Sequence, residues 1–220
     1  MRGPRPLVAD PWEAAYLRFE TPEEEIRKFE RRLRQLGAER WPKDARILEL
    51  FSGRGNGLVA LERLGLGYVT GVDLSPRLVK LARRRCFVGD CRALAIGDAS
   101  HDVAIVQGGL HHLPLLPTDL ERTLTEVTRV LKPGGLFLVV EPWLTPFLRV
   151  VHQVGCSAIG RRLWTKMDAL ATMIEHESAT YEQWLRQPAM ISAMLASRFE
   201  PCVNQRRWGK LLFVGRKPVS

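Results

Sequence analysis

The sequence predicts a doubly wound α/β fold with a mostly parallel sheet. Short apolar runs alternate with helical segments over residues 44–141, a pattern that indicates right-handed crossovers and a sheet covered on both faces. Two further strand-like runs near the end of the chain enclose Gly209, which favours an antiparallel C-terminal hairpin. The chain of 220 residues is 45% hydrophobic and 26% charged, and this composition excludes disordered, collagenous and disulfide-framework proteins.

The N-terminal part is predicted to be irregular over residues 1–12 and helical from Thr21. Thr21 can cap a helix, Pro22 suits its first turn, and Gly37 ends it. Apolar residues fall on one face of this helix, at Ile26, Phe29, Leu33 and Leu36.

Strands and helices then alternate up to Glu141. The expected elements, in chain order, are a strand at Arg46–Phe51, a helix ending near Leu64, a strand at Tyr68–Asp73, a helix at Pro76–Arg85, strands at Cys86–Gly89 and Asp102–Gln107, a helix at Leu120–Leu131 and a strand at Leu136–Glu141.

A helical insertion is expected at residues 142–185, after the fifth strand. This stretch has no clear strand but contains several large apolar side chains, among them Trp143, Phe147, Trp164, Met167, Met173, Tyr181 and Trp184. Aromatic residues at helical spacing usually fill a core, although a lid must also pack on the sheet while it lines a pocket. A helix at Ala189–Arg198 and strands at Cys202–Trp208 and Lys210–Arg216 complete the prediction.

Charge and cysteine content limit the possible partners and the cellular compartment of the protein. The net charge is +9, and residues 149–220 carry eleven basic and five acidic groups. The net charge first suggests nucleic acid or an anionic membrane as a partner. The excess in the last third is typical of a solvated basic face, and it hints at an anionic or phosphorylated acceptor. The four cysteines form no CxxC pair, which favours reduced thiols and a cytoplasmic protein. No apolar run has the length of a membrane span, and the N-terminus lacks the apolar region of a signal peptide.

A glycine-rich turn follows the first predicted strand. The segment from Ile47 to Gly57 reads ILELFSGRGNG, and Asp73 closes the second strand twenty residues after Gly53. Glycines let a ligand approach the backbone closely, and a carboxylate at Asp73 can accept hydrogen bonds from both ribose hydroxyls of a nucleoside cofactor. No Lys-Ser/Thr pair follows the glycines, so a phosphate-binding loop of the P-loop kind is not expected.

Five ordered motifs resemble the class I S-adenosylmethionine-dependent methyltransferases, in particular their small-molecule, methyltransferase type 11-like group. Besides the glycine turn, they are Gly89-Asp90-Cys91, Asp102-Val103-Ala104, the stretch QGGLHHL from Gln107 to Leu113, and Leu131-Lys132-Pro133-Gly134-Gly135. The resemblance covers residues 44–141, and it implies a Rossmann-like sheet and S-adenosyl-L-methionine as the cofactor.

The resemblance also implies roles for individual residues. Glu49 takes the acidic place of the glycine signature, Phe51 stands where its first glycine is usual, and Gly53 and Gly55 take the next two places. Asp73 would hold the ribose hydroxyls, and Leu74 would pack on the adenine. The remaining expected cofactor-binding residues are Asp90, Cys91 and Gln107.

The expected organisation is one methyltransferase domain over residues 1–220. It comprises an N-terminal helical cap (1–40), the cofactor-binding core (44–141), a helical lid (142–185) and a terminal helix and hairpin (186–220). The expected reaction is methyl transfer to a small-molecule acceptor, with a hydroxyl as the acceptor group. The charge distribution and the sequence leave the oligomeric state open.

The catalytic candidates are His111 and His112, because a hydroxyl acceptor needs a base and histidine has a suitable pKa. Glu141 and Tyr16 are weaker candidates, and one of the two histidines can equally well be structural. No metal site is expected, since neither HxxxH nor paired cysteines accompany the histidines.

Three other functions remain as alternatives. The first is an NAD(P)-dependent oxidoreductase, whose fingerprint would also have a glycine-rich turn followed by an acidic residue. The chain has no Tyr-xxx-Lys pair for hydride transfer, however. Methylation of RNA or another macromolecule is the second, although Gln107-Gly108-Gly109-Leu110 replaces the Asn/Asp-Pro-Pro-aromatic tetrad of enzymes that methylate base amines. The third is a non-catalytic S-adenosylmethionine-binding module.

Overall fold

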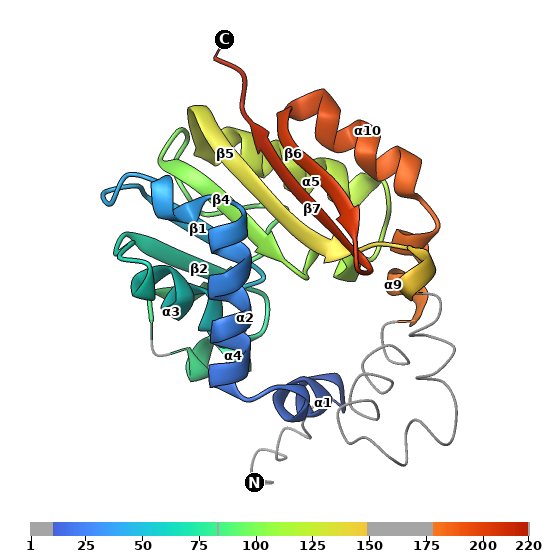
Figure 1. The fold of residues 1–220 in the computed structure, drawn as a ribbon, viewed down its shortest axis with the longest axis horizontal. Helices are drawn as coiled ribbons and strands as arrows, with labels where there is room; N and C mark the ends of the chain where they lie inside the picture. Colours follow the sequence, from blue (N-terminus) through green and yellow to red (C-terminus); the bar gives the residue numbers. More distant parts are fainter. Residues whose placement is uncertain (1–10, 83, 149–177, 220) are drawn as a thin grey trace, which may run out of the picture.

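A computed structural model describes residues 11–82, 84–148 and 178–219 of the chain (Figure 1). Seven strands form one sheet in the order β3-β2-β1-β4-β5-β7-β6. The strands β1 to β5 pair in parallel, and β7 runs antiparallel to both β5 and β6. The predicted fold class is therefore confirmed, including its C-terminal hairpin. The strands are β1 (Ile47–Leu50), β2 (Val69–Asp73), β3 (Cys86–Val88), β4 (His101–Gln107), β5 (Leu131–Pro142), β6 (Glu200–Arg207) and β7 (Lys210–Arg216).

Helices cover both faces of the sheet, as the crossovers require. The described α-helices are α1 (Pro11–Phe19), α2 (Pro22–Gln35), α3 (Asn56–Arg63), α4 (Pro76–Leu81), α5 (Thr118–Val130), α9 (Ser178–Leu185) and α10 (Pro188–Arg198), and the short 3₁₀ helices are η1 (Ala38–Arg40) and η2 (Leu110–His112). In Figure 1, α1 and α9 lie on the side of the molecule toward which β5 points. This side is the carboxyl edge of the parallel strands, where open α/β sheets bind their ligands.

Two buried apolar clusters lie on opposite faces of the sheet. The first joins alternate strand residues to α5, α9 and α10, with Leu124, Trp184 and Leu195 at its centre. The second joins the other strand residues to α2 and α3, through Leu33 and Leu58 among others. Burial of this apolar surface is the main free-energy term that holds the helices on the sheet.

The helix α2 begins where the sequence predicts it. The hydroxyl of Thr21 accepts a hydrogen bond from the Glu24 main-chain N–H, and the Glu24 carboxylate accepts one from the Thr21 main-chain N–H at 2.9 Å. This reciprocal capping box satisfies two main-chain donors that the helix itself leaves unpaired.

The largest differences from the sequence prediction concern α4, β5 and α1. The helix expected at Pro76–Arg85 ends at Leu81, because Ala82 adopts an extended conformation (φ −71°, ψ 103°) and the Arg85 carbonyl accepts from Gly71 in β2. Strand β5 begins at Leu131 rather than Leu136, with an irregular register between the two. Helix α1 begins inside the segment 1–12 that the sequence analysis expects to be irregular, and the helix-start signals of Pro11 and Glu13 are not used in that prediction.

The LKPGG segment lies inside this irregular start of β5. Gly134 has φ +75°, and a Cβ on Gly135 would lie 2.9 Å from the Lys132 carbonyl oxygen. Both glycines are therefore required by the backbone itself, as expected for a structural motif.

Most of the predicted insertion at residues 142–185 lies outside the described residues. The described residues at its C-terminal end form α9. Trp184 of this helix is buried, and its Nε1 donates to the Pro142 carbonyl at 2.9 Å. Within the described residues, no helix is long and apolar enough to cross a membrane.

Candidate functional site

The glycine-rich turn connects β1 to α3 at the carboxyl edge of the sheet. Gly53 and Gly55 have φ values of +53° and +78°, a region that favours glycine. The main-chain N–H of Gly53 donates to Asp73 Oδ2 at 2.7 Å, and that of Ser75 donates to Asp73 Oδ1 at 2.9 Å. The carboxylate at the end of β2 is thereby fixed against the turn, so the structure brings together the two strongest sequence signals.

Glu49 is a buried carboxyl group directly beneath this turn. It is 3% exposed, and Gln107 Nε2 donates to its Oε1 at 3.4 Å. Its Oε2 has no hydrogen-bond partner among the described residues. Burial raises the pKa of Glu49 to about 8. A buried acceptor oxygen without a donor is costly, so it points to a ligand donor such as an ammonium group.

Two glycines shape the space around Glu49 and Phe51. A Cβ on Gly57 would lie 2.0 Å from Glu49 Oε1, and a Cβ on Gly109 would lie 2.2 Å from the Phe51 ring. Phe51 itself adopts φ +55°, which is unusual for a bulky side chain and marks a strained turn of the kind that active sites can contain. Its ring lies 6.5 Å from that of His112.

The other predicted cofactor-binding residues occupy different environments. Leu74 is 66% exposed next to Asp73. The Asp90 carboxylate accepts from Arg92 Nε at 3.0 Å and from Arg92 Nη2 at 2.7 Å, and these bonds lower the pKa of Asp90. Cys91 is buried in the core, with its Sγ 3.5 Å from Thr123 Oγ1. Only the main chain of Cys91 can therefore face a ligand at the sheet edge.

His111 and Glu141 form a buried pair at the end of β5. His111 Nδ1 lies 2.7 Å from Glu141 Oε2, while Glu141 Oε1 accepts from the main-chain N–H groups of Gly109 and Leu110 at 2.7 Å each. Glu141 is 1% exposed. A carboxylate bound to Nδ1 fixes the ring orientation and favours a proton on that nitrogen, which leaves Nε2 as the basic atom.

Two aromatic neighbours enclose the His111 ring. The Tyr181 ring of α9 meets it edge-on at a centroid distance of 5.7 Å, and the His112 ring lies 4.1 Å away. His112 is only partly buried, and the bond to Glu141 belongs to His111. The structure thus separates two histidines that the sequence could not distinguish.

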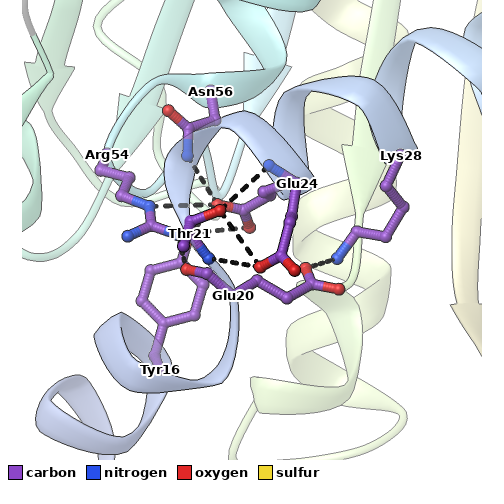
Figure 2. A network of polar contacts seen from close by, with 8 residues as sticks. Tyr16, Glu20, Thr21, Glu24, Lys28, Arg54 and Asn56 are labelled. Atoms are coloured by element: carbon purple, nitrogen blue, oxygen red, sulfur yellow. Dashed lines mark hydrogen bonds and ion pairs between the residues drawn. The ribbon is translucent and has the colours of Figure 1, made fainter. Parts of the chain in front are cut away.

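Figure 2 shows a polar network that ties the N-terminal helices to the glycine turn. Its centre is the buried carboxylate of Glu25, which accepts from Tyr16 Oη at 3.0 Å, Arg54 Nη2 at 2.9 Å and Asn56 Nδ2 at 2.7 Å. Arg54 also donates to the Glu20 carbonyl at 2.7 Å. The helices α1 and α2 therefore cover the turn, and a Cβ on Gly53 would lie 3.2 Å from the Tyr16 hydroxyl oxygen.

Sequence reasoning missed Glu25 and Arg54. Glu25 is one of three consecutive glutamates at the start of α2, and all three suit the positive end of the helix dipole. Nothing in that local pattern separates the buried member from its exposed neighbours. Among the described residues, no three His, Cys, Asp or Glu side chains are grouped as metal ligands.

A family model described as a methyltransferase domain matches residues 48–139. Among curated proteins, a demethylmenaquinone methyltransferase from Thermus thermophilus is 33% identical over 124 residues, which cover 52% of this chain and 54% of the relative. A probable phthiotriol/phenolphthiotriol dimycocerosates methyltransferase from Mycobacterium ulcerans is 37% identical over 100 residues, which cover 42% of this chain and 37% of the relative. The chain thus spans about half the length of the first curated relatives it matches.

Solved structures share the fold over nearly the whole chain. A Pyrococcus horikoshii protein superposes with a TM-score of 0.66 at 18% identity, and the match covers 95% of this chain and 99% of that one. An S-adenosylmethionine-dependent methyltransferase from Methanosarcina mazei has a TM-score of 0.56 at 21% identity, with 82% of this chain and 95% of that one covered.

Proposed function

We propose a function for this chain from one premise: residues 48–139 are a methyltransferase domain of the class I S-adenosylmethionine-dependent family. The proposed function is methyl transfer from S-adenosylmethionine to a hydroxyl group of a small-molecule acceptor. We choose a hydroxyl as the acceptor group because His111 Nδ1 lies 2.7 Å from the buried Glu141 carboxylate. This contact supports the proposal, because the carboxylate would hold His111 as an oriented base at the ligand edge of the sheet.

The residues present fit S-adenosylmethionine. Asp73, at the end of β2, would accept from the ribose hydroxyls, and the unpartnered Oε2 of Glu49 would accept from the cofactor's ammonium group. Gly53 and Gly55 permit close approach of the cofactor to the turn. The remaining proposed contacts are made by Phe51, Leu74, Asp90, the main chain of Cys91, and Gln107.

When bound, the cofactor supplies an activated methyl group whose leaving group is a neutral thioether. The protein's own contribution is alignment, exclusion of water and removal of the acceptor proton. His111 would take this proton on Nε2, and the Glu141 carboxylate would stabilise the resulting imidazolium through Nδ1. His112, the other candidate, would then line the site beside Phe51.

The names of the curated relatives support an acceptor with an apolar portion. They refer to demethylmenaquinone and to phthiotriol dimycocerosates. Near the end of β5, this chain exposes three large apolar side chains, Leu144, Phe147 and Trp208, and the rings of Phe147 and Trp208 meet edge-on at 5.5 Å. These side chains would suit an acceptor with an apolar portion.

The N-terminal cap and the segment after β5 are proposed to close over the reacting groups, within a single domain. Tyr16 of α1 reaches the glycine turn, and Tyr181 of α9 contacts His111. Both contacts support a lid at residues 142–185 that acts together with the cap.

Gly53→Val is expected to abolish cofactor binding while the chain stays folded. The substitution forces a β-branched residue into a left-handed conformation and pushes its Cβ toward the Tyr16 hydroxyl, 3.2 Å away. Calorimetry with S-adenosylhomocysteine measures the loss, and thermal unfolding verifies the fold. The matched control is Gly67→Val, because a Cβ there meets nothing within 4 Å. Normal binding by Gly53→Val would mean that the turn only connects β1 to α3.

The proposed reaction is tested with S-adenosylmethionine that carries an isotopically labelled methyl group. The protein is incubated with matched phenols, anilines and thiols, and mass spectrometry follows the label. We expect the labelled methyl group on the phenol oxygen and no label on the aniline or the thiol. Label found only on nitrogen or sulfur would contradict the hydroxyl assignment, while the cofactor assignment would stand.

A further inference from the structure

A positively charged hollow lies beside the N-terminal helices. Its volume is about 550 Å³, and its lining residues are Glu20, Glu24, Arg27, Lys28, Arg31, Arg32 and Gln35. Figure 2 shows that part of this lining, Glu20, Glu24 and Lys28, adjoins the network around Arg54. The hollow therefore neighbours the glycine turn.

The carboxylates of the hollow are already engaged. Glu20 pairs with Lys28, and Glu24 accepts from Thr21 in the capping box. Arg27 is paired with Glu23 at 3.0 Å. By contrast, no hydrogen bond or ion pair joins the Arg32 side chain to any described residue. The carboxylates of Glu20, Glu25 and Glu141 act on Arg32 through space, but none of them pairs directly with its guanidinium.

Lys210 of β7 is a second half-buried cation, close enough to Arg32 and Lys28 for their charges to act on it. In β7, alternate residues share a face, and Val214 packs in the cluster that contains Leu33 of α2. Lys210 lies on that face, at the end of the strand opposite Pro142 of β5. Burial, then the charges of Arg32 and Lys28, lowers the pKa of Lys210 to about 7. Within the described residues, its side chain makes no hydrogen bond or ion pair.

The cluster also lies within electrostatic reach of the proposed base. The Glu141 carboxylate, which holds His111, acts on both Arg32 and Lys210. Arg32 and Lys210 are half-buried, so a direct ionic partner would offset the cost of their partial desolvation, and a bound anion can be that partner. A planar guanidinium beside an ammonium group suits a carboxylate or phosphate.

We propose that Arg32 and Lys210, supported by Lys28, bind a carboxylate or phosphate group carried by the methyl acceptor. The identification of the ligand as the methyl acceptor rests on the proposed function, whereas the anion site itself does not require methyl transfer. It gives the acceptor two parts: a hydroxyl directed to His111 and an anionic group held at the start of β7.

Anion binding to Lys210 should depend on pH. The groups that face Lys210 are Arg32 and Lys28 on α2, Glu20 before α2 and Glu141 on β5. An anion favours the protonated amine, so binding takes up a proton when the pKa of the free amine is about 7. The affinity is therefore strongest below that pKa and falls as the pH rises through it.

The test measures binding of three probes by calorimetry in the absence of cofactor: inorganic phosphate, para-hydroxybenzoate and its neutral amide. We expect phosphate or para-hydroxybenzoate to bind at least about tenfold more tightly than the amide, and the better of the two identifies the anionic group. Arg32→Gln and Lys210→Met should each weaken that anion about tenfold or more, since a hydrogen bond to a charged group contributes about 1.5–3 kcal/mol. Lys210→Arg should keep binding, and the binding of para-hydroxybenzoate, whose charge does not change near neutrality, should lose its pH dependence there.

The control is Arg27→Gln, which lies in the same hollow but is paired with Glu23 and should change the affinity less than about twofold. Equal anion affinity in the unchanged protein, Arg32→Gln and Lys210→Met would overturn the proposal. Binding of S-adenosylhomocysteine is measured in parallel for each variant. Normal cofactor binding with no anion binding refutes only this site, whereas anion binding without cofactor binding refutes only the methyltransferase function.

Discussion

Asp73→Ala is expected to lower the affinity for S-adenosylhomocysteine about a hundredfold or more. The Asp73 carboxylate would accept two hydrogen bonds from the ribose, and each charge-assisted bond contributes about 1.5–3 kcal/mol. The same carboxylate fixes the Gly53 main chain at 2.7 Å, so its loss also loosens the turn. Calorimetry measures the affinity, and thermal unfolding verifies that the variant is folded.

The comparison variant for Asp73 is Asp102→Ala. Asp102 is the second residue of β4, at the opposite edge of the sheet, where it accepts from the Arg46 main chain at 2.8 Å and from Lys132 at 2.7 Å. Its loss should cost stability but leave cofactor affinity unchanged. If a folded Asp73→Ala variant binds the cofactor product as tightly as Asp102→Ala does, the ribose assignment is wrong.

His111→Gln is expected to reduce kcat by about 10²–10⁴, the usual contribution of a positioned general base. Cofactor affinity should not change, because the proposed cofactor contacts lie on other residues. Single-turnover rates with a phenol acceptor give the measurement. His112→Gln should cost less than about tenfold, since the bond to Glu141 belongs to His111. A larger loss in His112→Gln than in His111→Gln would reverse the assignment.

Glu141→Gln tests whether Glu141 positions His111 for proton transfer or only supports the fold. The amide oxygen can still accept from Gly109 and Leu110, but the amide nitrogen cannot accept a proton from His111 Nδ1. The pH profile of kcat should therefore shift in this variant, with thermal stability close to that of the unchanged protein.

The alternation of strands and helices could be predicted from the sequence, because the spacing of apolar residues and the positions of glycines are local signals. Thr21, the glycines near Gly53 and the apolar strand at Ile47–Leu50 each point to the element that forms. The extent of α4 could not be predicted, since its end depends on the pairing of the following segment with β2. The long irregular β5 likewise depends on the partner strand β4.

The candidate site was only partly predictable for the same reason. Asp73 and the glycine turn follow consecutive strands, so the topology places them together. The Glu141–His111 pair joins residues 30 apart, and the link from Glu25 to Arg54 spans 29. Both contacts arise from packing between elements. A single sequence carries no local sign of such contacts, and this explains why Glu25 and Lys210 were not singled out.

The most direct test of the central claim is calorimetric titration of the unchanged protein with S-adenosylhomocysteine and, separately, with NADH. The account predicts saturable binding of S-adenosylhomocysteine at one site per chain, and no binding of NADH. Saturable binding of NADH, or a folded protein that binds neither compound, would contradict it.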